Sequence, residues 1–430
     1  MKIIVLGTRG FPNVQGGVES HCQNLYPNLV EKGHEVIVLA RSPYVGKTAY
    51  EYKGVKVIPT WAPKSKFLEA YFHTILGVIK ARRMGCDVLH IHAIGPGICV
   101  TDARILGMKV VFTHHGPDYQ RKKWNKLAKF VLKFGEYLAC KFSNRVIAIS
   151  KNITEHVEEI FYRKAEFIPN GVIVEERVET DAILKKYGLE KGKYILTVGR
   201  FVPEKGFHDL IDAFSIAIGH RSQDVGNRKE STDSRWSMVH GQKNKVHSQG
   251  NVHSLQTIVH SEDIKDQSPK ANSSELIANS SMKLVIVGGA DHEDDYSRSL
   301  KEKAQNTSGV ILTGVLKGID LKEMYSHAGL FVLPSYYEGL PITLLEALSY
   351  GLNVIVSDIE ANREVDLDDN RFFTPGMLTG MADKIKYFLN NPLNDEQKNK
   401  QIEMIRQRYN WEKIAERTEE VYNMVHRRSQ

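Results

Sequence analysis

Cysteine is scarce in this chain of 430 residues, and the four present, Cys22, Cys86, Cys99 and Cys140, form no C-x-x-C pair and no other metal-ligand spacing. Their scarcity argues against a disulfide framework and predicts reduced thiols in a cytosolic protein. Long apolar runs are also missing, and no stretch approaches the ~20 residues of a membrane-spanning helix. The first residues, MKIIVLG, lack the basic and apolar regions of a signal peptide. We therefore expect a cytoplasmic protein.

Neither sign of charge dominates. Lys and Arg number 58, Asp and Glu number 51, and the net charge is +7. Such a small basic excess suits anionic partners such as phosphorylated substrates or lipid headgroups, but solubility alone accounts for it equally well. We expect no nucleic-acid partner. The composition, 42% hydrophobic and 25% charged residues, is typical of a soluble globular protein, and the length allows two domains.

Short runs rich in valine and isoleucine alternate with amphipathic stretches such as residues 18–32. The strand-like runs of the first half are KIIVLG, EVIVLA, DVLHIH, KVVFTHH and RVIAIS. A second series begins with KYILTVGR at residues 193–200 and continues through MKLVIVGG, GVILTG, LFVLPS and LNVIVSD. This alternation predicts βαβ units and parallel sheets that are covered on both faces.

We therefore expect an α/β protein with two doubly wound, Rossmann-like domains that face each other across a cleft. Their predicted bounds are residues 1–180 and 190–400, and a helix at residues 405–430 is expected to pack back toward the first domain. Ligands bind outside the carboxyl ends of the strands in such sheets. The residues that follow each strand are therefore the candidates for function.

Residues 221–281 interrupt this pattern, being rich in Ser, Asn, Gln, Lys and Asp. Val-His recurs four times within them, which suggests a metal site, but nothing in the sequence fixes the geometry of these histidines. We expect a disordered or loosely structured insertion without chemistry. The acidic stretches 291–295 and 366–370 have no convergent partners that we can name, so we interpret both as solvated loops. The sequence thus predicts no metal and no cofactor.

Two carboxylates bracket an apolar run in SYYEGLPITLLEALSYG, residues 335–351. Pro341 suits the first turn of a helix that ends at Gly351, so Glu338 lies in the turn and Glu346 within the helix. The free N–H groups of Ile342 and Thr343 would form an anion site, with a carboxylate at each side for sugar hydroxyls. The alternative is a capped core helix with a surface glutamate at each end.

Other candidates follow three more strands. Arg200 and Lys205 lie five residues apart in a glycine-containing loop and could clamp a diphosphate, although two solvated cations are the alternative. Gly16 and Gly17 precede a helix, where backbone can approach a ligand closely. That stretch is not G-x-G-x-x-G, so the dinucleotide fingerprint is absent. His114 and His115 end a strand, and one of the two would face the cleft.

Taken together, these residues resemble the retaining, nucleotide-sugar-dependent glycosyltransferases of family 4, which have the GT-B fold. Glu338 and Glu346 match the E-x7-E motif of that family, and Arg200 and Lys205 match its paired basic residues. His115, in HHGPD, matches its T-x-H position. The stretches GTRGFPNVQGGVES and HGPDYQRKKW are similar to bacterial polysaccharide and rhamnosyl-type transferases. The resemblance covers nearly the whole chain except residues 221–281.

The resemblance implies roles for residues in the second domain. Glu346 would hold the ribose hydroxyls of the nucleotide, and Glu338 would contact hydroxyls of the donor sugar. Arg200 and Lys205 would stabilise the leaving diphosphate. The further substrate-binding residues implied there are Gly339, Ile342 and Thr343 near the diphosphate, and Thr313, Gly314, Val315 and Leu316 around the base.

In the first domain, the resemblance implies that Gly16 and Gly17 approach the diphosphate and that His115 lies near the donor sugar. The implied activity is transfer of a hexosyl-type sugar from a nucleoside diphosphate sugar to a glycan or lipid-linked acceptor, without a metal. Cations and amides aimed at the departing charge would be the main catalytic device. Two alternatives remain, a nucleotide-sugar 2-epimerase and a catalytically silent sugar-nucleotide-binding scaffold. A nicotinamide dehydrogenase is disfavoured because no G-x-G-x-x-G follows a strand.

Residues 121–142 have the pattern of an amphipathic helix. Lys122, Lys126, Lys129 and Lys133 form one stripe, and the opposite face carries Trp124, Leu127, Val131, Phe134 and Leu138. We expect the apolar face to pack into the domain core. The lysines would then lie in water, or meet anionic lipid on the inner face of the cytoplasmic membrane.

Overall fold

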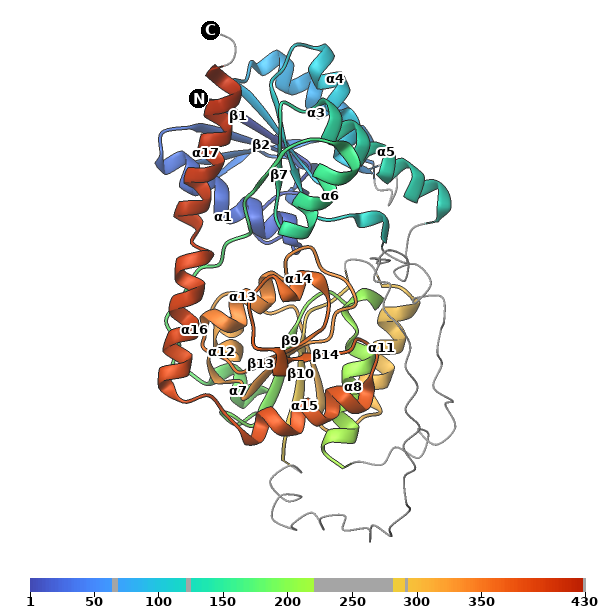
Figure 1. The fold of residues 1–430 in the computed structure, drawn as a ribbon, viewed down its shortest axis with the longest axis vertical. Helices are drawn as coiled ribbons and strands as arrows, with labels where there is room; N and C mark the ends of the chain where they lie inside the picture. Colours follow the sequence, from blue (N-terminus) through green and yellow to red (C-terminus); the bar gives the residue numbers. More distant parts are fainter. Residues whose placement is uncertain (64–68, 121–124, 220–280, 291–292, 428–430) are drawn as a thin grey trace, which may run out of the picture.

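A computed structural model describes residues 1–63, 69–120, 125–219, 281–290 and 293–427 of the chain. These residues form two α/β domains, one above the other in Figure 1, each built on a parallel sheet. The predicted architecture of two doubly wound domains is confirmed. The predicted insertion at residues 221–281 and the stretch 291–292 fall outside the described residues, except for Ser281.

The N-terminal sheet has the strand order β3-β4-β2-β1-β5-β6-β7-β8, and only the β3–β4 pair is antiparallel. Its central strands are buried along almost their whole length because helices cover both faces, which is why they are apolar runs without alternation. The strands are β1 (Lys2–Leu6), β2 (Glu35–Arg41), β3 (Tyr50–Tyr52), β4 (Val55–Thr60), β5 (Val88–His92), β6 (Val110–His114), β7 (Arg145–Ala148) and β8 (Ala165–Phe167). The helices are α1 (Gly17–Glu31), α2 (Ser42–Val45), α3 (Glu69–Met84), the 3-10 helix η1 (Pro96–Cys99), α4 (Val100–Ile105), the 3-10 helix η2 (Asp118–Gln120), α5 (Lys126–Phe142) and α6 (Lys151–Phe161).

The C-terminal sheet is parallel throughout, with the order β11-β10-β9-β12-β13-β14. Its strands are β9 (Tyr194–Val198), β10 (Lys283–Val287), β11 (Val310–Gly314), β12 (Leu330–Leu333), β13 (Val354–Ser357) and β14 (Phe372–Phe373). Its helices are α7 (Ala182–Lys186), the 3-10 helix η3 (Pro203–Lys205), α8 (Phe207–Ala217), α11 (Asp295–Gln305), α12 (Gly318–His327), α13 (Ile342–Ser349), α14 (Glu360–Arg363), the 3-10 helix η5 (Asp369–Arg371), α15 (Leu378–Asn390) and α16 (Asp395–Arg408). The sheet order reverses between β9 and β12, so the loops after these two strands border the switch point where α/β proteins bind ligands.

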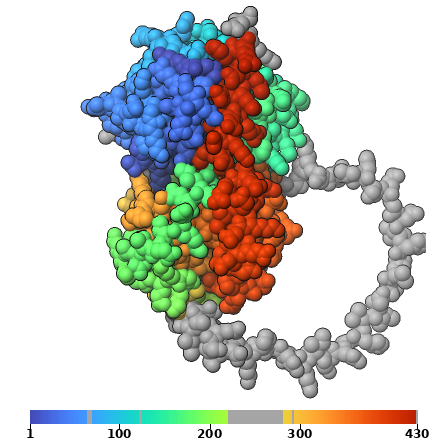
Figure 2. Space-filling model, turned by 90° about the vertical axis from the view of Figure 1, so that its left-hand side faces the viewer, coloured from blue at the N-terminus to red at the C-terminus, as the bar shows by residue number. Residues whose placement is uncertain are grey.

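The chain ends by returning to the first domain. Helix α16 packs against α13, and the last helix, α17 (Trp411–Arg427), packs against α1 and the strands β5 and β6. Figure 2 shows this red C-terminal segment running along both domains. The chain also passes from the first domain to the second through residues 168–181. The two passages touch, because Val172 N donates to Tyr409 O at 2.9 Å.

Helix α5 is packed differently from the prediction. Leu127, Val131 and Phe134 are exposed, by 72%, 44% and 46%, so the expectation that this apolar face lies in the core is wrong. The buried residues of α5 are Gly135, Glu136, Ala139 and Cys140 in its second half. Small residues let the helix approach η1 closely there, since a Cβ at Gly97 of η1 would lie 2.8 Å from Ala139 Cβ and 3.0 Å from the carbonyl oxygen of Gly135. Lys122 and Trp124 lie outside the described residues. No described helix is long and apolar enough to cross a bilayer.

Candidate active site

An ion pair joins the loops that follow β9 and β12. Lys205, the last residue of η3, places its Nζ 2.5 Å from Oε1 of Glu338, and both side chains are largely buried. Ser335 Oγ donates to the same carboxylate oxygen at 2.7 Å. Arg200 lies in the same loop as Lys205 and is half-buried. Two of the predicted site residues, one cation and one anion, are thus in direct contact at the switch point.

Helix α13 begins beside this pair. Pro341 is its N-cap, and its carbonyl accepts from Leu344 N and Leu345 N at 3.1 and 3.3 Å. The N–H groups of Ile342 and Thr343 therefore stand in the first turn, where an α-helix leaves its donors unused. The buried hydroxyl of Thr343 has no hydrogen-bond partner among the described residues. These donors at a helix N-terminus suit an anionic ligand.

Glu346 lies further along α13 and is half-buried. Tyr325 OH donates to its Oε2 at 2.8 Å. Burial raises the pKa of Glu346 to about 7; the hydrogen bond from Tyr325 opposes this shift, and the charge of Glu175 adds to it. Glu175 comes from the passage between the domains and forms an ion pair with Lys322 of α12. Neither Tyr325 nor Glu175 lies in a recognisable sequence motif, so neither contact could be predicted from the sequence.

The predicted base-binding segment lies at the edge of the C-terminal sheet. Strand β11 ends at Gly314, whose φ of +74° favours glycine. The carbonyl of Thr313 already accepts from Tyr187 OH at 3.0 Å. Val315 is 48% exposed and Leu316 is half-buried. A flat apolar group could lie against this turn while the backbone meets its polar edge.

In the N-terminal domain, a buried ion pair shapes the loop that carries Gly16 and Gly17. Arg9 N and Nε donate to Glu19 Oε1 at 3.0 and 3.2 Å, and the guanidinium also donates to the carbonyl of Gln15. Burial alone would raise the pKa of Glu19, but the charge and hydrogen bonds of Arg9 hold it below its usual range. A Cβ at Gly16 would lie 2.0 Å from Glu19 Oε2, so only glycine fits. Arg9 and Glu19 are further residues that the sequence analysis missed.

The two histidines at the end of β6 differ in burial. His114 is buried, with Nε2 2.7 Å from Glu136 Oε1 and Nδ1 accepting from Gly116 N at 3.0 Å. His115 is partly exposed, with Nε2 2.9 Å from His92 Nδ1. Burial, together with the neighbouring imidazoles of His21 and His90, pushes the pKa of His115 well below its usual range. His115 is therefore a neutral, half-buried ring.

The two domains meet directly at the His115 loop. A Cβ at Gly339 would lie 2.4 Å from the carbonyl oxygen of His115, and one at Gly116 would lie 2.7 Å from Tyr337 OH. The loops that carry His115 and Glu338 are therefore in contact.

Two further contacts join the domains. Lys317 Nζ donates to the carbonyl of Asn13 at 3.0 Å. The N-terminus of α6 donates to Glu364, from Lys151 N at 2.7 Å and Asn152 N at 3.0 Å. The contacts between the domains therefore include loops that follow β1, β6, β11 and β12, the strands that lead into the predicted residues.

Among the described residues, His21, His92 and His115 are the one group of three side chains spaced to hold a metal ion, with ring nitrogens within 4.8 Å of one another. Two of these nitrogens already share the His92–His115 hydrogen bond, and His21 Nδ1 lies 2.8 Å from Asn170 Oδ1. In the stretch 366–370, Asp366 pairs with Arg408 and Asp369 with Arg363.

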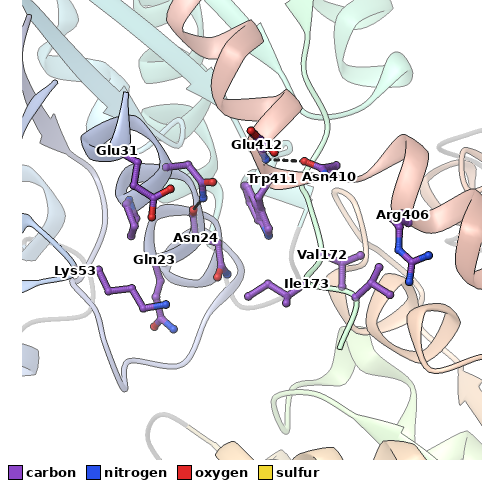
Figure 3. A pocket seen from close by; sticks show the side chains of 13 residues that line it. Gln23, Asn24, Glu31, Lys53, Val172, Ile173, Arg406, Asn410, Trp411 and Glu412 are labelled. Atoms are coloured by element: carbon purple, nitrogen blue, oxygen red, sulfur yellow. Dashed lines mark hydrogen bonds between the residues drawn. The ribbon is translucent and has the colours of Figure 1, made fainter. Parts of the chain in front are cut away.

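A cavity of about 400 Å³ lies away from this site, between α1 and the junction of α16 and α17 (Figure 3). Figure 3 shows Trp411 between Lys53 on one side and Arg406 on the other. It borders the passages between the domains rather than the carboxyl ends of the strands. We therefore place the candidate active site at the strand ends, where the charged pairs and the helix N-terminus converge.

Comparison with known proteins agrees with the geometry. Glycosyltransferase Family 4 matches residues 15–176, and Glycosyl transferases group 1 matches residues 255–408. The chain is 24% identical over 470 residues to an uncharacterized glycosyltransferase of Methanocaldococcus jannaschii, covering 99% of this chain and 98% of the relative. It is 26% identical over 286 residues to the UDP-Gal:alpha-D-GlcNAc-diphosphoundecaprenol alpha-1,3-galactosyltransferase of Escherichia coli, covering 64% and 59%.

Among solved structures, HepE from Anabaena in complex with UDP-glucose aligns with a TM-score of 0.67 at 16% identity, covering 99% of this chain and 100% of HepE. The likeness confirms the predicted GT-B fold. The rhamnosyl-type subgroup stays a prediction.

Proposed function

Since the chain is a glycosyltransferase of the GT-B fold, we propose that it transfers a hexosyl-type sugar from a nucleoside diphosphate sugar to a glycan or lipid-linked acceptor, with retention of the anomeric configuration. The observation that carries the proposal is the convergence of Lys205, Glu338 and the N-terminus of α13 opposite His115. HepE, which shares the fold, binds UDP-glucose, and the Escherichia coli relative acts on a diphosphoundecaprenol-linked sugar. A role in cell-surface polysaccharide synthesis follows from such an acceptor.

The proposed chemistry begins with departure of the diphosphate. The anomeric C–O bond breaks, its electron pair passes to the diphosphate oxygen, and the sugar becomes oxocarbenium-like. Lys205, Arg200 and the N–H groups of Ile342 and Thr343 would stabilise the growing negative charge. Retention would follow from attack by the acceptor hydroxyl on the face from which the diphosphate leaves, with the hydroxyl proton passing to the departing diphosphate oxygen. The proposal assigns no covalent nucleophile and no metal.

In the enzyme without donor, Lys205 and Glu338 neutralise each other in an ion pair. Before the donor binds, Glu338 balances the charge of Lys205 in a largely buried position, where an unpaired charge would cost several kcal/mol, roughly 3–5. When the donor arrives, its diphosphate would take over Lys205, and Glu338 would be free to accept from hydroxyls of the sugar. Glu346 would hold the ribose and Thr313–Leu316 the base.

The proposal is tested by screening UDP-, GDP- and dTDP-sugars for thermal stabilisation of the protein, and then for transfer to lipid-linked and glycan acceptors. Stabilisation by one donor class and a product with the anomeric configuration of that donor are expected. Interconversion of free nucleotide sugars without an acceptor would instead identify an epimerase. Binding without any turnover of the donor would favour a scaffold.

The raised pKa of Glu346 predicts a pH-dependent donor affinity. The carboxyl is mostly protonated at pH 6 and mostly ionised at pH 8, because its pKa is about 7. An ionised carboxylate accepts from both ribose hydroxyls, so the Kd for the nucleotide sugar should fall about tenfold over this range. Glu346→Gln should bind weakly at every pH. Calorimetric titration with the donor measures the Kd of the wild type and of the variant at each pH. An equally steep pH dependence in the variant would contradict the role of Glu346 in holding the ribose.

The raised pKa of Glu346 also predicts how the stability of the folded protein changes with pH. The folded pKa lies above the ordinary 4.5, so the folded state holds the proton more tightly and loses stability as pH rises from about 5 to 7. Glu346→Gln should therefore gain stability relative to the wild type at pH 8 and keep little of that gain at pH 5. Melting curves at the two pH values test this independently of any substrate.

We also propose that α5 docks on an anionic membrane surface, as a cytoplasmic enzyme with a lipid-linked acceptor requires. The first half of the helix is exposed, including Leu127, Phe130 and Val131. Lys126 and Lys133 are exposed beside them, and Lys129 is half-buried. Apolar side chains could enter the lipid interface while the lysines meet headgroups, each contributing ~1 kcal/mol.

Changing Lys126, Lys129 and Lys133 to Gln should sharply reduce sedimentation with anionic liposomes and leave the melting temperature unchanged. Added salt should have the same effect on the wild type. Changing Leu127 and Phe130 to Ser should weaken the binding that survives high salt. A control with Lys185, Lys186 and Lys191 of the C-terminal domain changed to Gln should sediment like the wild type. Equal sedimentation of all variants at low salt would rule out docking through α5.

A further inference from the structure

A row of buried polar rings connects the C-terminal helix to His115. The Tyr422 hydroxyl lies 2.6 Å from His90 Nδ1, which lies 3.0 Å from the Tyr26 hydroxyl. The Tyr26 hydroxyl lies 2.5 Å from His92 Nε2, and His92 Nδ1 lies 2.9 Å from His115 Nε2. We call these five side chains the ring relay. They come from α17, β5, α1 and the loop after β6, which are far apart in sequence.

Local structure explains why these rings meet. His90 and His92 are two residues apart on β5, so both side chains point to the same face of the sheet. Their rings stack with centroids 4.1 Å apart. Helices α1 and α17 cover that face and bring Tyr26 and Tyr422 over the two imidazoles. These four side chains are fully buried, so water does not reach them and each depends on its neighbours for hydrogen bonds.

The buried rings are neutral. Burial pushes the pKa of His90 and His92 well below the usual range and raises the pKa of Tyr26 well above it. A neutral imidazole has one N–H donor and one acceptor nitrogen. Since both nitrogens of His92 are hydrogen-bonded, the position of its single proton decides which role it takes toward His115.

That position also decides the state of His115. If His92 carries its proton on Nδ1, it donates to His115 Nε2, and His115 must carry its own proton on Nδ1. If His92 carries it on Nε2, His115 donates from Nε2 and its Nδ1 is an acceptor. No described residue hydrogen-bonds to Nδ1 of His115, so this nitrogen is the one left for a ligand.

We propose that His92 is a positioning residue which, with Tyr26, His90 and Tyr422 behind it, holds the ring of His115 in one orientation and one tautomer toward the donor sugar. The inference rests on the proposed function in that His115 meets the sugar. The inference adds that α17, the last helix of the chain, helps to hold the ring of His115, because Tyr422 completes the ring relay. Without the relay, the His115 ring would rotate and exchange tautomers, and fewer molecules would present the correct nitrogen.

The test measures sugar transfer and the tautomer of His115 in the full-length protein. His92→Leu should lower kcat by at least tenfold while the Kd for the free nucleotide changes less than twofold, because the nucleotide site lies in the other domain. His92→Asn can still offer a hydrogen-bonding group near the position of Nδ1 and should recover part of the rate. Tyr422→Phe should cost a smaller factor, about threefold. NMR of ¹⁵N-labelled histidine should show one tautomer of His115 in the wild type and an average of two in His92→Leu.

The matched control is Tyr194→Phe, which removes a buried hydroxyl that donates to Met324 O at 2.7 Å outside the relay. It should leave both kcat and the spectrum of His115 unchanged. A wild-type rate in folded His92→Leu and Tyr422→Phe would overturn the proposal, and so would a reduced rate with an unchanged His115 tautomer. If the protein transfers no sugar at all, the proposed function fails, yet the NMR comparison still decides whether the relay fixes His115.

Discussion

Replacing Lys205 by Ala is expected to lower kcat for sugar transfer by about 100-fold or more, with a smaller effect on the Kd of the donor. Removing one preorganised donor to developing charge typically raises the barrier by ~3 kcal/mol. The diphosphate already carries charge in the bound donor, so Lys205 contributes to binding, but its largest contribution comes as the anomeric bond breaks. Single-turnover kinetics with the true donor separate the two effects.

The control for Lys205→Ala is Lys303→Ala. Lys303 also forms a partly buried ion pair, at 2.6 Å with Asp212, but this pair joins α11 to α8 away from the strand ends. The Lys303→Ala variant should lose some stability and keep the turnover of the wild type. Lys205→Ala also leaves Glu338 with one partner fewer, so Lys205→Ala combined with Glu338→Gln shows how much of the loss comes from an unpaired carboxylate. Wild-type turnover in Lys205→Ala and Arg200→Ala would exclude the diphosphate clamp.

Gly339→Ala is expected to reduce kcat by a similar factor through a different cause. The added Cβ would lie 2.4 Å from the His115 carbonyl oxygen, so the loops after β6 and β12 could not meet as they do here. Donor binding should weaken less than kcat, because the other implied contacts to the diphosphate, Lys205 and the first turn of α13, remain. The chemical step should suffer, because His115 and Glu338 would no longer face the sugar at the same distance.

Gly95→Ala is the matched control, since a Cβ there meets only Leu132 at 3.6 Å, an ordinary contact. Calorimetry with the donor and steady-state kinetics, run on both variants, test the difference. With donor bound, small-angle scattering should give a larger radius of gyration for Gly339→Ala than for the wild type. Equal kcat in the two glycine variants would show that contact between these loops is not needed for transfer.

The sequence predicted the fold better than the contacts around the candidate site. Lys205 and Glu338 could be placed after two strands, because strand-like runs precede both and parallel strands share one carboxyl edge. Their ion pair could not be foreseen, because it depends on rotamers of residues 133 positions apart. The environment of Glu346 likewise depends on Glu175, which lies in a stretch without secondary structure.

Two other gaps have physical reasons. The spacing of apolar residues in α5 predicted an amphipathic helix. Spacing alone does not show whether the apolar face packs on the helix's own domain. In the structure, the residues that pack on the domain are mainly small ones in the second half of α5. The ring relay was missed because a histidine in an apolar strand looks like an isolated core residue. One signal was present, since the spacing of His90 and His92 puts both rings on one face of a strand, where a shared partner is expected.

The contact between Val172 and Tyr409 has a mechanical consequence. The two covalent links between the domains run side by side, and a Cβ at Gly171 would already lie 2.6 Å from the ring of Trp411. Any rotation of one domain against the other must therefore be taken up at this double hinge. The three bridges at Asn13, Gly339 and Glu364 belong to elements elsewhere in the two domains and would have to break for a wide rotation. Tyr422 of α17 packs on the first domain beyond this hinge, so a rotation there would leave its contact with His90 intact.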